Sequence, residues 1–204
     1  MSHPMNCVLI TGATGVIGSE VVPLFLDDDF QVRLIVRARS PEHLRERTDE
    51  LLRYWDRSPD EARWAGRLEA LIGDVCQPKL GLDDATFDRV VGEVTHVVHA
   101  AGNVKLNQPI EEARQSALDS ARHVAELAWA CQRSGRFVKL DAVSTVGVAG
   151  RMEGLVPERP LTEPREFHNN YERAKAEAEQ YLLGELAAGL PLTIHRPSMV
   201  VGRS

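Results

Sequence analysis

Residues 169–182, NNYERAKAEAEQYL, place a tyrosine and a lysine four positions apart at the start of a helical pattern rich in Ala, Glu and Lys. Residues i and i+4 share one helix face, so the Tyr171 phenol and the Lys175 ammonium are expected to be neighbours. Such a pair has two interpretations. It is either an ordinary surface pair or a proton-transfer device in which the ammonium lowers the pKa of the phenol.

A glycine pattern, TGATGVIG at residues 11–18, stands between an apolar run and a helical pattern. Gly12 is expected to form a tight turn, Gly15 to let backbone approach a pyrophosphate, and Gly18 to let the helix pack closely. The N-terminus of a helix attracts phosphate. In this setting the pattern predicts dinucleotide binding rather than a plain tight turn. We assign cofactor contacts here to Gly12, Thr14, Gly15, Val16 and Ile17.

The second apolar run ends in IVRARS, where Arg37 and Arg39 stand about 20 positions after the glycines. An NAD-selective site typically carries an acidic residue at this distance, which binds the ribose 2′-hydroxyl. Two guanidinium groups suit a 2′-phosphate instead. The pattern therefore favours NADP(H), and the alternative is a solvated strand end.

The third and fourth strand patterns end in residues that suit a cofactor crevice. The third ends in GDV, which contains Asp74 and Val75. Asp74 either accepts a hydrogen bond from the adenine amino group or caps a turn. The fourth ends in HAAG, whose small residues let a cofactor lie against the backbone. From it we assign Ala100, Ala101 and Gly102 to the cofactor site.

The fifth strand pattern ends in Ser144 and Thr145, and a hydroxyl there is expected to face the same crevice. The carboxyl ends of parallel strands meet at one edge of a sheet, where ligands bind. The hydroxyl, Tyr171 and Lys175 are therefore expected to converge there. This convergence favours the proton-transfer interpretation of the Tyr–Lys pair.

Strand and helix patterns alternate along the whole chain. The expected strands cover 7–11, 30–38, 67–74, 95–102, 136–145 and 192–202, and the expected helices 15–28, 41–55, 82–93, 110–131 and 169–189. This order predicts an α/β fold, a doubly wound parallel sheet of the Rossmann type, in one domain over 1–204. The irregular stretch 149–170 lies between a strand and a helix, as loops that serve a site often do.

Composition excludes several classes of protein. The chain has 204 residues, a net charge of -6 and three widely spaced cysteines. No basic stripe indicates nucleic-acid binding, and no cysteine spacing indicates a disulfide framework or a zinc site, so no metal is assigned. We see no signal peptide and no apolar run long enough to span a membrane, and we expect a cytoplasmic protein.

Taken together, the motifs resemble the extended short-chain dehydrogenase/reductases. The matches are TGxxGxxG at 11–18, GDV at 73–75, HAAG at 99–102, ST at 144–145, YxxxK at 171–175 and RPSMVVG at 196–202. Within that group the chain is most similar to the thioester-reductase branch. That branch includes the terminal reductase domains of carboxylic acid reductases and peptide synthetases, and the fatty acyl-CoA reductases. The segments LIVRARSPEHLRERTDELLRYW and LEALIGDVCQPKLGL carry this similarity.

The resemblance implies a Thr–Tyr–Lys triad of Thr145, Tyr171 and Lys175, with Tyr171 and Lys175 also touching the cofactor. It implies NADP(H) as cofactor, Arg37 on the 2′-phosphate, and Ser144, Pro197 and Ser198 near the nicotinamide. The implied activity is NADPH-dependent reduction of a CoA- or carrier-protein-bound acyl thioester to an aldehyde or alcohol.

Two alternatives stay open: a ketone or alcohol oxidoreductase or sugar epimerase of the same fold, and a non-catalytic NADP(H)-binding module. The sequence also departs from the family twice. Ala117 stands where related chains often have Asn, and the chain stops at Ser204, so the C-terminal substrate subdomain is expected to be absent.

Overall fold

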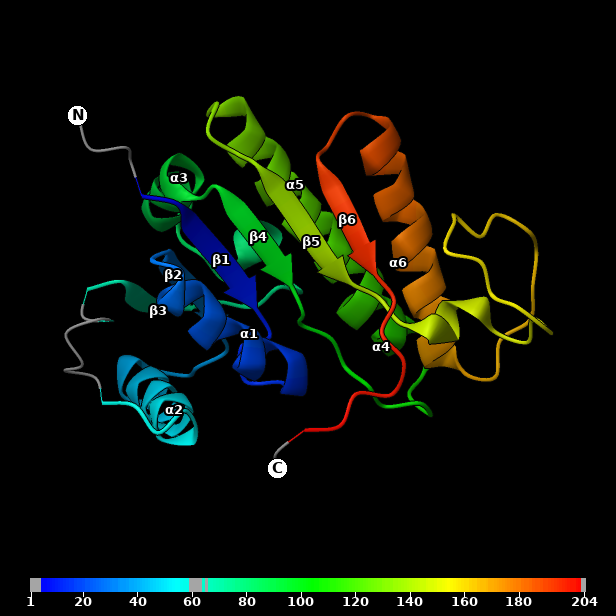
Figure 1. Cartoon of the computed structure of the whole chain (residues 1–204), viewed down its shortest axis with the longest axis horizontal. Helices are drawn as coiled ribbons and strands as arrows, with labels where there is room; N and C mark the ends of the chain where they lie inside the picture. The colour runs from blue at the N-terminus through cyan, green and yellow to red at the C-terminus, as the bar shows by residue number, and fades with distance from the viewer. Residues whose placement is uncertain (1–4, 59–63, 65, 203–204) are drawn as a thin grey trace.

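A six-stranded parallel sheet forms the centre of the computed structural model, which describes residues 5–58, 64 and 66–202. The strands lie in the order β3-β2-β1-β4-β5-β6 (Figure 1). Their bounds are β1 Cys7–Thr11, β2 Gln31–Val36, β3 Leu68–Ile72, β4 His96–His99, β5 Lys139–Val143 and β6 Leu192–His195. The order reverses between β1 and β4, so the carboxyl ends of these two strands border the crevice where such sheets bind ligands.

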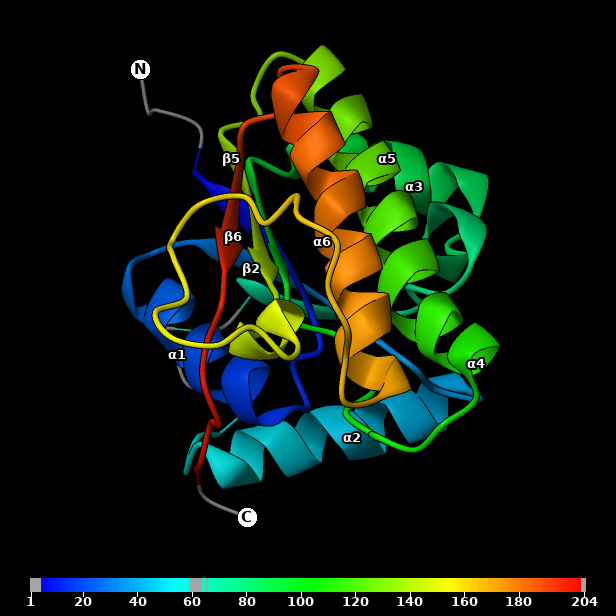
Figure 2. The same cartoon turned by 90° about the vertical axis from the view of Figure 1, so that its right-hand side faces the viewer.

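Helices cover the sheet from both sides, which confirms the predicted doubly wound fold. Helices α1 and α2 lie on one face, and α3, α5 and α6 lie on the other (Figures 1 and 2). The helix bounds are α1 Val16–Asp27, α2 Pro41–Tyr54, α3 Asp84–Glu93, α4 Ile110–Arg114, α5 Ser120–Arg133 and α6 Asn170–Ala187. Three short turns complete the set: the 3₁₀ turns η1 Pro78–Gly81 and η3 Val146–Ala149, and the π-turn η2 Gln115–Asp119.

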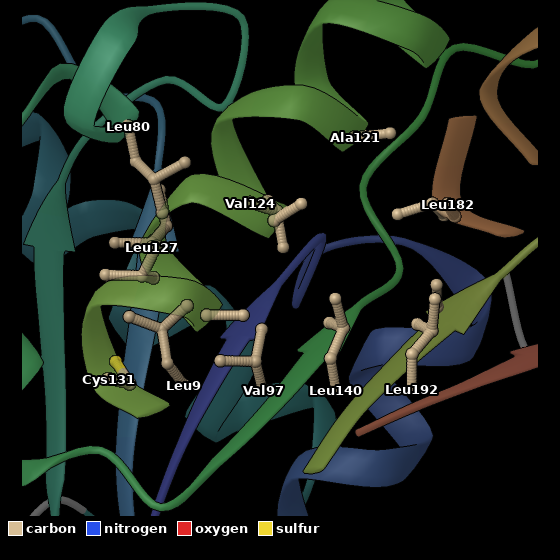
Figure 3. Close-up of a cluster of buried hydrophobic side chains, with 14 of the residues drawn as sticks. Leu9, Leu80, Val97, Ala121, Val124, Leu127, Cys131, Leu140, Leu182 and Leu192 are labelled. Carbon is tan, nitrogen blue, oxygen red and sulfur yellow. The ribbon is translucent and has the colours of Figure 1, made fainter. Parts of the chain in front are cut away.

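Strand β1 shows why the strand sequences are almost continuously apolar. Its alternate residues point to opposite faces of the sheet. Leu9 joins the cluster beneath α5, together with Val97, Leu127 and Leu140 (Figure 3), whereas Ile10 joins the cluster beneath α1 and α2. Both faces of the strand are therefore buried, as parallel sheets require.

Side-chain caps set the starts of three helices. The Ser40 hydroxyl accepts from the His43 amide at 3.2 Å at the start of α2, where Pro41 occupies the first helical position. The Asp83 carboxylate caps α3 in the same way. At α6 the Asn169 side chain accepts from the Glu172 amide at 2.9 Å. This last cap fixes the helix start at Asn170, one residue before Tyr171.

Helix α1 contains Pro23 without ending there. A proline lacks an amide hydrogen, so it leaves the carbonyl of the residue four positions earlier, Ser19, without its helical partner. The indole Nε1 of Trp55, which follows α2, donates to the Ser19 carbonyl at 2.6 Å. The proline therefore serves to join α1 to the end of α2.

Two expected elements differ from the observed ones. The expected helix over 110–131 is interrupted by the π-turn of residues 115–119, and such turns occur often at functional sites. The expected last strand over 192–202 ends at His195, and residues 196–202 leave the sheet. No helix among the described residues has the length and apolar character needed to cross a lipid bilayer.

Candidate active site

The glycine turn is sterically tied to the end of β4. Gly12 has a φ of +77°, and a Cβ added to it would lie 2.5 Å from the Ala101 nitrogen. A Cβ on Gly18 would lie 2.2 Å from the Gly12 carbonyl oxygen. Both positions therefore exclude any side chain. The geometry agrees with the expected tight turn at Gly12 and close packing at Gly18, and it brings Ala100 and Ala101 against the turn.

The N-terminus of α1 fits the phosphate groups of a dinucleotide. Gly15 is exposed at the cap position, where it offers no side chain to cap the first amides of the helix. Thr14 and Val16 beside it are also exposed, whereas Ile17 is half-buried. Free amides at the positive end of a helix dipole bind anions.

Arg47, which the sequence did not single out, lies against the glycine turn. Arg37 and Arg39 are exposed just after β2, as expected. Arg47 of α2 reaches across to them: its guanidinium donates to the Arg37 carbonyl at 2.7 Å and to the Thr14 hydroxyl at 3.1 Å. The sequence held no signal that separates Arg47 from its neighbour Arg45, because both fit a solvated helix.

Asp74 caps a turn, which is one of the two roles expected for it from the sequence. Its Oδ1 accepts from the Cys76 amide at 2.9 Å. The adenine contact stays a prediction, and the second carboxylate oxygen is the atom that would make it. The neighbouring Val75 carbonyl contacts the ring of His123 at 3.0 Å, which anchors the end of β3 to α5.

Thr145, Tyr171 and Lys175 meet where β5 ends. The Thr145 hydroxyl accepts from the Gly147 amide at 3.1 Å and lies close enough to the Tyr171 phenol to lower its pKa. Lys175 Nζ donates to the Val143 carbonyl at 2.8 Å. The expected convergence of these three residues is therefore present in the structure.

Burial sets the protonation of the Tyr–Lys pair. It raises the pKa of Tyr171, against the opposing effect of the hydrogen bond to Thr145, and the Glu172 charge raises it further. Burial also lowers the pKa of Lys175 to about 8, against the opposing charge of Glu179. The expected lowering of the Tyr171 pKa by Lys175 is not found, because the ammonium is directed to the Val143 carbonyl.

Ser144 points away from Thr145. Its hydroxyl is buried and donates to the Glu179 carboxylate of α6 at 2.7 Å. Successive side chains of an extended chain lie on opposite sides, so only one of the two hydroxyls can face the crevice. Ser144 faces α6 in the structure, and a contact between Ser144 and the cofactor stays a prediction.

Residues 196–202 connect the two halves of the site. The Val146 amide, one residue after Thr145, donates to the Pro197 carbonyl at 3.0 Å. Further along, a Cβ on Gly202 would lie 3.1 Å from Val16 at the start of α1. This segment therefore runs from the triad to the glycine turn, with Pro197 half-buried and Ser198 exposed along it.

A groove of about 1180 Å³ extends from the site over β4, β5 and β6. Apolar side chains from α1 and α6 form much of its lining, including Ile17, Phe25, Leu183 and Leu186. The loop before α6 contributes residues 156–160. The long irregular stretch predicted to serve a site therefore lies at this groove.

A smaller cavity of about 10 Å³ lies behind the triad, lined by Lys175, Glu179, His99 and Ala117 among others. Ala117 is buried in the π-turn, and its occurrence there in place of Asn stays an expectation from the sequence. Within the residues that the structure describes, no group of three or more His, Cys, Asp or Glu could hold a metal ion.

The chain is one of the extended short-chain dehydrogenase/reductases, a class of nicotinamide-dependent oxidoreductases. It has the sheet order and the glycine turn at the first crossover that are typical of this class. The chain belongs to the NAD-binding family described as "Male sterility protein", which it matches over residues 10–204.

Similar proteins place the chain in the thioester-reductase branch of that class. It is 32% identical over 200 residues to an isonitrile lipopeptide synthase of Streptomyces coeruleorubidus, covering 96% of this chain and 13% of that protein. It is 31% identical to the non-reducing polyketide synthase SAT8 of Stachybotrys chartarum, covering 97% of this chain and 8% of the synthase.

Among solved structures, the terminal R domain of the myxalamid PKS-NRPS pathway superposes with a TM-score of 0.84 at 29% identity, covering 100% of this chain and 51% of that one. The reductase domain of a non-ribosomal peptide synthetase from Mycobacterium tuberculosis superposes with a TM-score of 0.75 at 26% identity, covering 96% of this chain and 48% of that one. The chain thus spans about half the length of these two domains.

Proposed function

We propose that the chain is the cofactor-binding and catalytic part of an NADP(H)-dependent reductase of acyl thioesters. The observation that carries this proposal is the meeting of Thr145, Tyr171 and Lys175 at the carboxyl end of β5. Support for the reaction comes from the relatives, several of which are described as reductase domains of peptide synthetases. Their assembly-line context favours a carrier-bound or CoA-bound acyl group as substrate.

The residues fit an NADP(H) molecule along the carboxyl edge of the sheet. The amides after Gly15 would hold the pyrophosphate, and Arg37, Arg39 and Arg47 would bind the 2′-phosphate. Asp74 would accept from the adenine. The small residues 100–102 and the segment at Pro197 and Ser198 would border the nicotinamide. When bound, the reduced nicotinamide supplies the hydride.

Tyr171 is suited to donate a proton. Because its pKa is raised, the phenol keeps its proton at neutral pH. Thr145 accepts from the Gly147 amide, which leaves its own hydroxyl hydrogen able to donate. The Tyr171 hydroxyl would donate to the carbonyl oxygen of the thioester as negative charge develops on it, and the Thr145 hydroxyl beside it would turn its hydrogen from Tyr171 to the same oxygen. Hydride addition to the carbonyl carbon and this protonation would give a hemithioacetal. Its collapse to an aldehyde would release the thiol of the carrier protein or of CoA, and a second NADPH would reduce the aldehyde to an alcohol.

Lys175 is suited to hold the cofactor ribose beside Tyr171. An ammonium has three hydrogens, and the Val143 carbonyl takes one of them. The other two would donate to the hydroxyls of the ribose. The positive charge would also support the negative charge that develops during the reaction.

The apolar groove is the place for the acyl chain. It begins at Val146 and Pro197, beside the triad, and its walls of Leu, Val, Phe and Pro side chains suit a hydrocarbon or polyketide group. The identity of that group depends on residues beyond this chain, since the related reductase domains are about twice as long.

The test is NADPH oxidation by the chain in the presence of a panel of acyl-CoA and carrier-bound acyl thioesters, with the aldehyde trapped chemically. We expect oxidation with at least one thioester and none with a matched ketone or nucleotide sugar. Oxidation with the ketone alone would support the alcohol oxidoreductase alternative. Tightly retained NAD after purification would support the epimerase alternative.

A further inference from the structure

A buried carboxylate lies one turn after Lys175 on α6. The Glu179 side chain is 4% exposed. It accepts from Ser144 Oγ at 2.7 Å and from Arg196 Nε at 3.1 Å, and a second guanidinium nitrogen of Arg196 also contacts it. A buried carboxylate is costly unless it is paired and hydrogen-bonded, so these donors make its burial possible. The proton transfer described above does not use Glu179 directly.

Lys175 and Glu179 hold two consecutive residues at the end of β5. Lys175 donates to the Val143 carbonyl, and Glu179 accepts from the Ser144 hydroxyl. The next residue is Thr145. Two successive turns of α6 therefore hold the end of β5, which leads directly to Thr145. Helix α6 runs alongside β5 and β6 (Figure 2).

Glu179 also anchors the exit of β6 and the loop over the groove. The guanidinium of Arg196 that it binds donates onward to the Pro157 carbonyl at 3.2 Å and to the Arg159 carbonyl at 3.0 Å. Both carbonyls belong to the groove lining. One carboxylate thus connects the ends of two strands, a helix and a loop.

The charged and titratable groups around Lys175 come from three elements. Glu179 and Tyr171 belong to its own helix, and His99 ends β4 with a pKa lowered by burial to about 3, so that ring is neutral. Arg196, beyond β6, is engaged by Glu179. Among the described residues, Glu179 is the carboxylate whose charge acts on Lys175.

We propose that Glu179 is a positioning residue that keeps Lys175 charged and holds Thr145 in place beside it. Burial alone favours a neutral lysine, and the carboxylate one turn away opposes that effect. This inference deepens the proposed function and rests on it, because Glu179 acts through two members of the triad. The charge on Lys175 can, however, be measured without cofactor or substrate.

The experiment is a pH titration of the lysine Cε signals of the ¹³C-labelled chain by NMR. The chain has four lysines, Lys79, Lys105, Lys139 and Lys175, so the signals are few, and the one missing from Lys175→Met is assigned. In Glu179→Gln we expect the Lys175 midpoint to fall by about one pH unit or more. The matched control is Glu177→Gln on the same helix, whose carboxylate binds Arg114 and Arg173, and there the midpoint should not move.

A double variant, Glu179→Gln with Arg196→Gln, covers the case in which Glu179→Gln leaves the guanidinium unpaired and the chain does not fold. It removes both charges of the pair, and the midpoint is again expected to fall. An unchanged Lys175 midpoint in a folded variant would overturn the proposal and make Glu179 a purely structural residue. Because the titration needs neither NADPH nor a thioester, it decides this inference even if the proposed function fails.

Discussion

The Tyr171 hydroxyl is the atom on which the proposed proton transfer depends. Replacing Tyr171 with Phe keeps the ring and removes that hydroxyl. We expect the rate of thioester reduction to fall by about 10²–10⁴-fold, the usual contribution of a positioned general acid, while NADPH binding changes far less. Steady-state rates and a fluorescence titration of the same sample check this. Full activity in the variant would show that Tyr171 is not the proton donor.

Lys175 makes stability depend on pH. Burial lowers its pKa from 10.5 to about 8, so the unfolded chain binds more protons than the folded one between these values. The contribution of Lys175 to the free energy of unfolding is therefore lowest below pH 8 and rises as the pH approaches 10.5. Lys175→Met should abolish this dependence and raise the free energy of unfolding most at neutral pH, by up to about 3 kcal/mol. Denaturant unfolding at several pH values measures it, and a larger gain at high pH would contradict it.

Arg47 should matter for NADPH and not for NADH. Removing its guanidinium by Arg47→Ala takes away one of three positive charges beside the glycine turn, so we expect NADPH affinity to fall about tenfold and NADH affinity to stay nearly constant. Arg45→Ala is the control, since Arg45 lies on the same helix and pairs with Glu42. Equal losses for both cofactors would show that Arg47 acts only by holding the Thr14 loop.

At the scale of elements, the contact between Trp55 and Ser19 joins α1 to α2. Trp55→Phe removes the indole donor and leaves the Ser19 carbonyl without a partner, which should cost about 1–3 kcal/mol of unfolding free energy. In a Pro23→Ala background the helix can supply its own amide to that carbonyl. The cost of Trp55→Phe should therefore be smaller there, and an equal cost in both backgrounds would contradict the account.

The elements themselves were predictable from the sequence because their signals are local. Strand runs with burial on both faces and the glycine turn each depend on a few neighbouring residues. The π-turn at 115–119 was not predictable, since its residues keep an ordinary helical spacing. The last strand was overestimated because the apolar residues 199–201 continue the pattern after the chain has left the sheet.

The site was predictable where a residue type at a fixed spacing carries the chemistry, as for Tyr171 and Lys175. It was not predictable where the role depends on a contact between distant segments. Arg47 contacts Thr14, 33 residues away in sequence, and Ser144 contacts Glu179, 35 residues away. Neither pair has a local signature, and the orientation of Ser144 followed only from the packing of α6 on β5.

In the whole molecule, the edge of the sheet that is proposed to bind the cofactor adjoins an apolar groove. The arginines and the glycine turn lie on the α1 and α2 side of the site, and the groove extends over β4, β5 and β6. The related reductase domains continue for about as many residues again. Under the proposed function, this chain supplies cofactor binding and proton transfer, and the groove supplies a place for the acyl chain.

The central claim is that this chain binds NADP(H) in preference to NAD(H). The most direct measurement is a titration of the 204-residue chain with NADPH and, separately, with NADH, followed by tryptophan fluorescence. Three guanidinium groups and no acidic residue at the end of β2 predict that NADPH binds about tenfold more tightly or better. Equal or tighter binding of NADH would contradict the claim and would reassign the arginines to the protein surface.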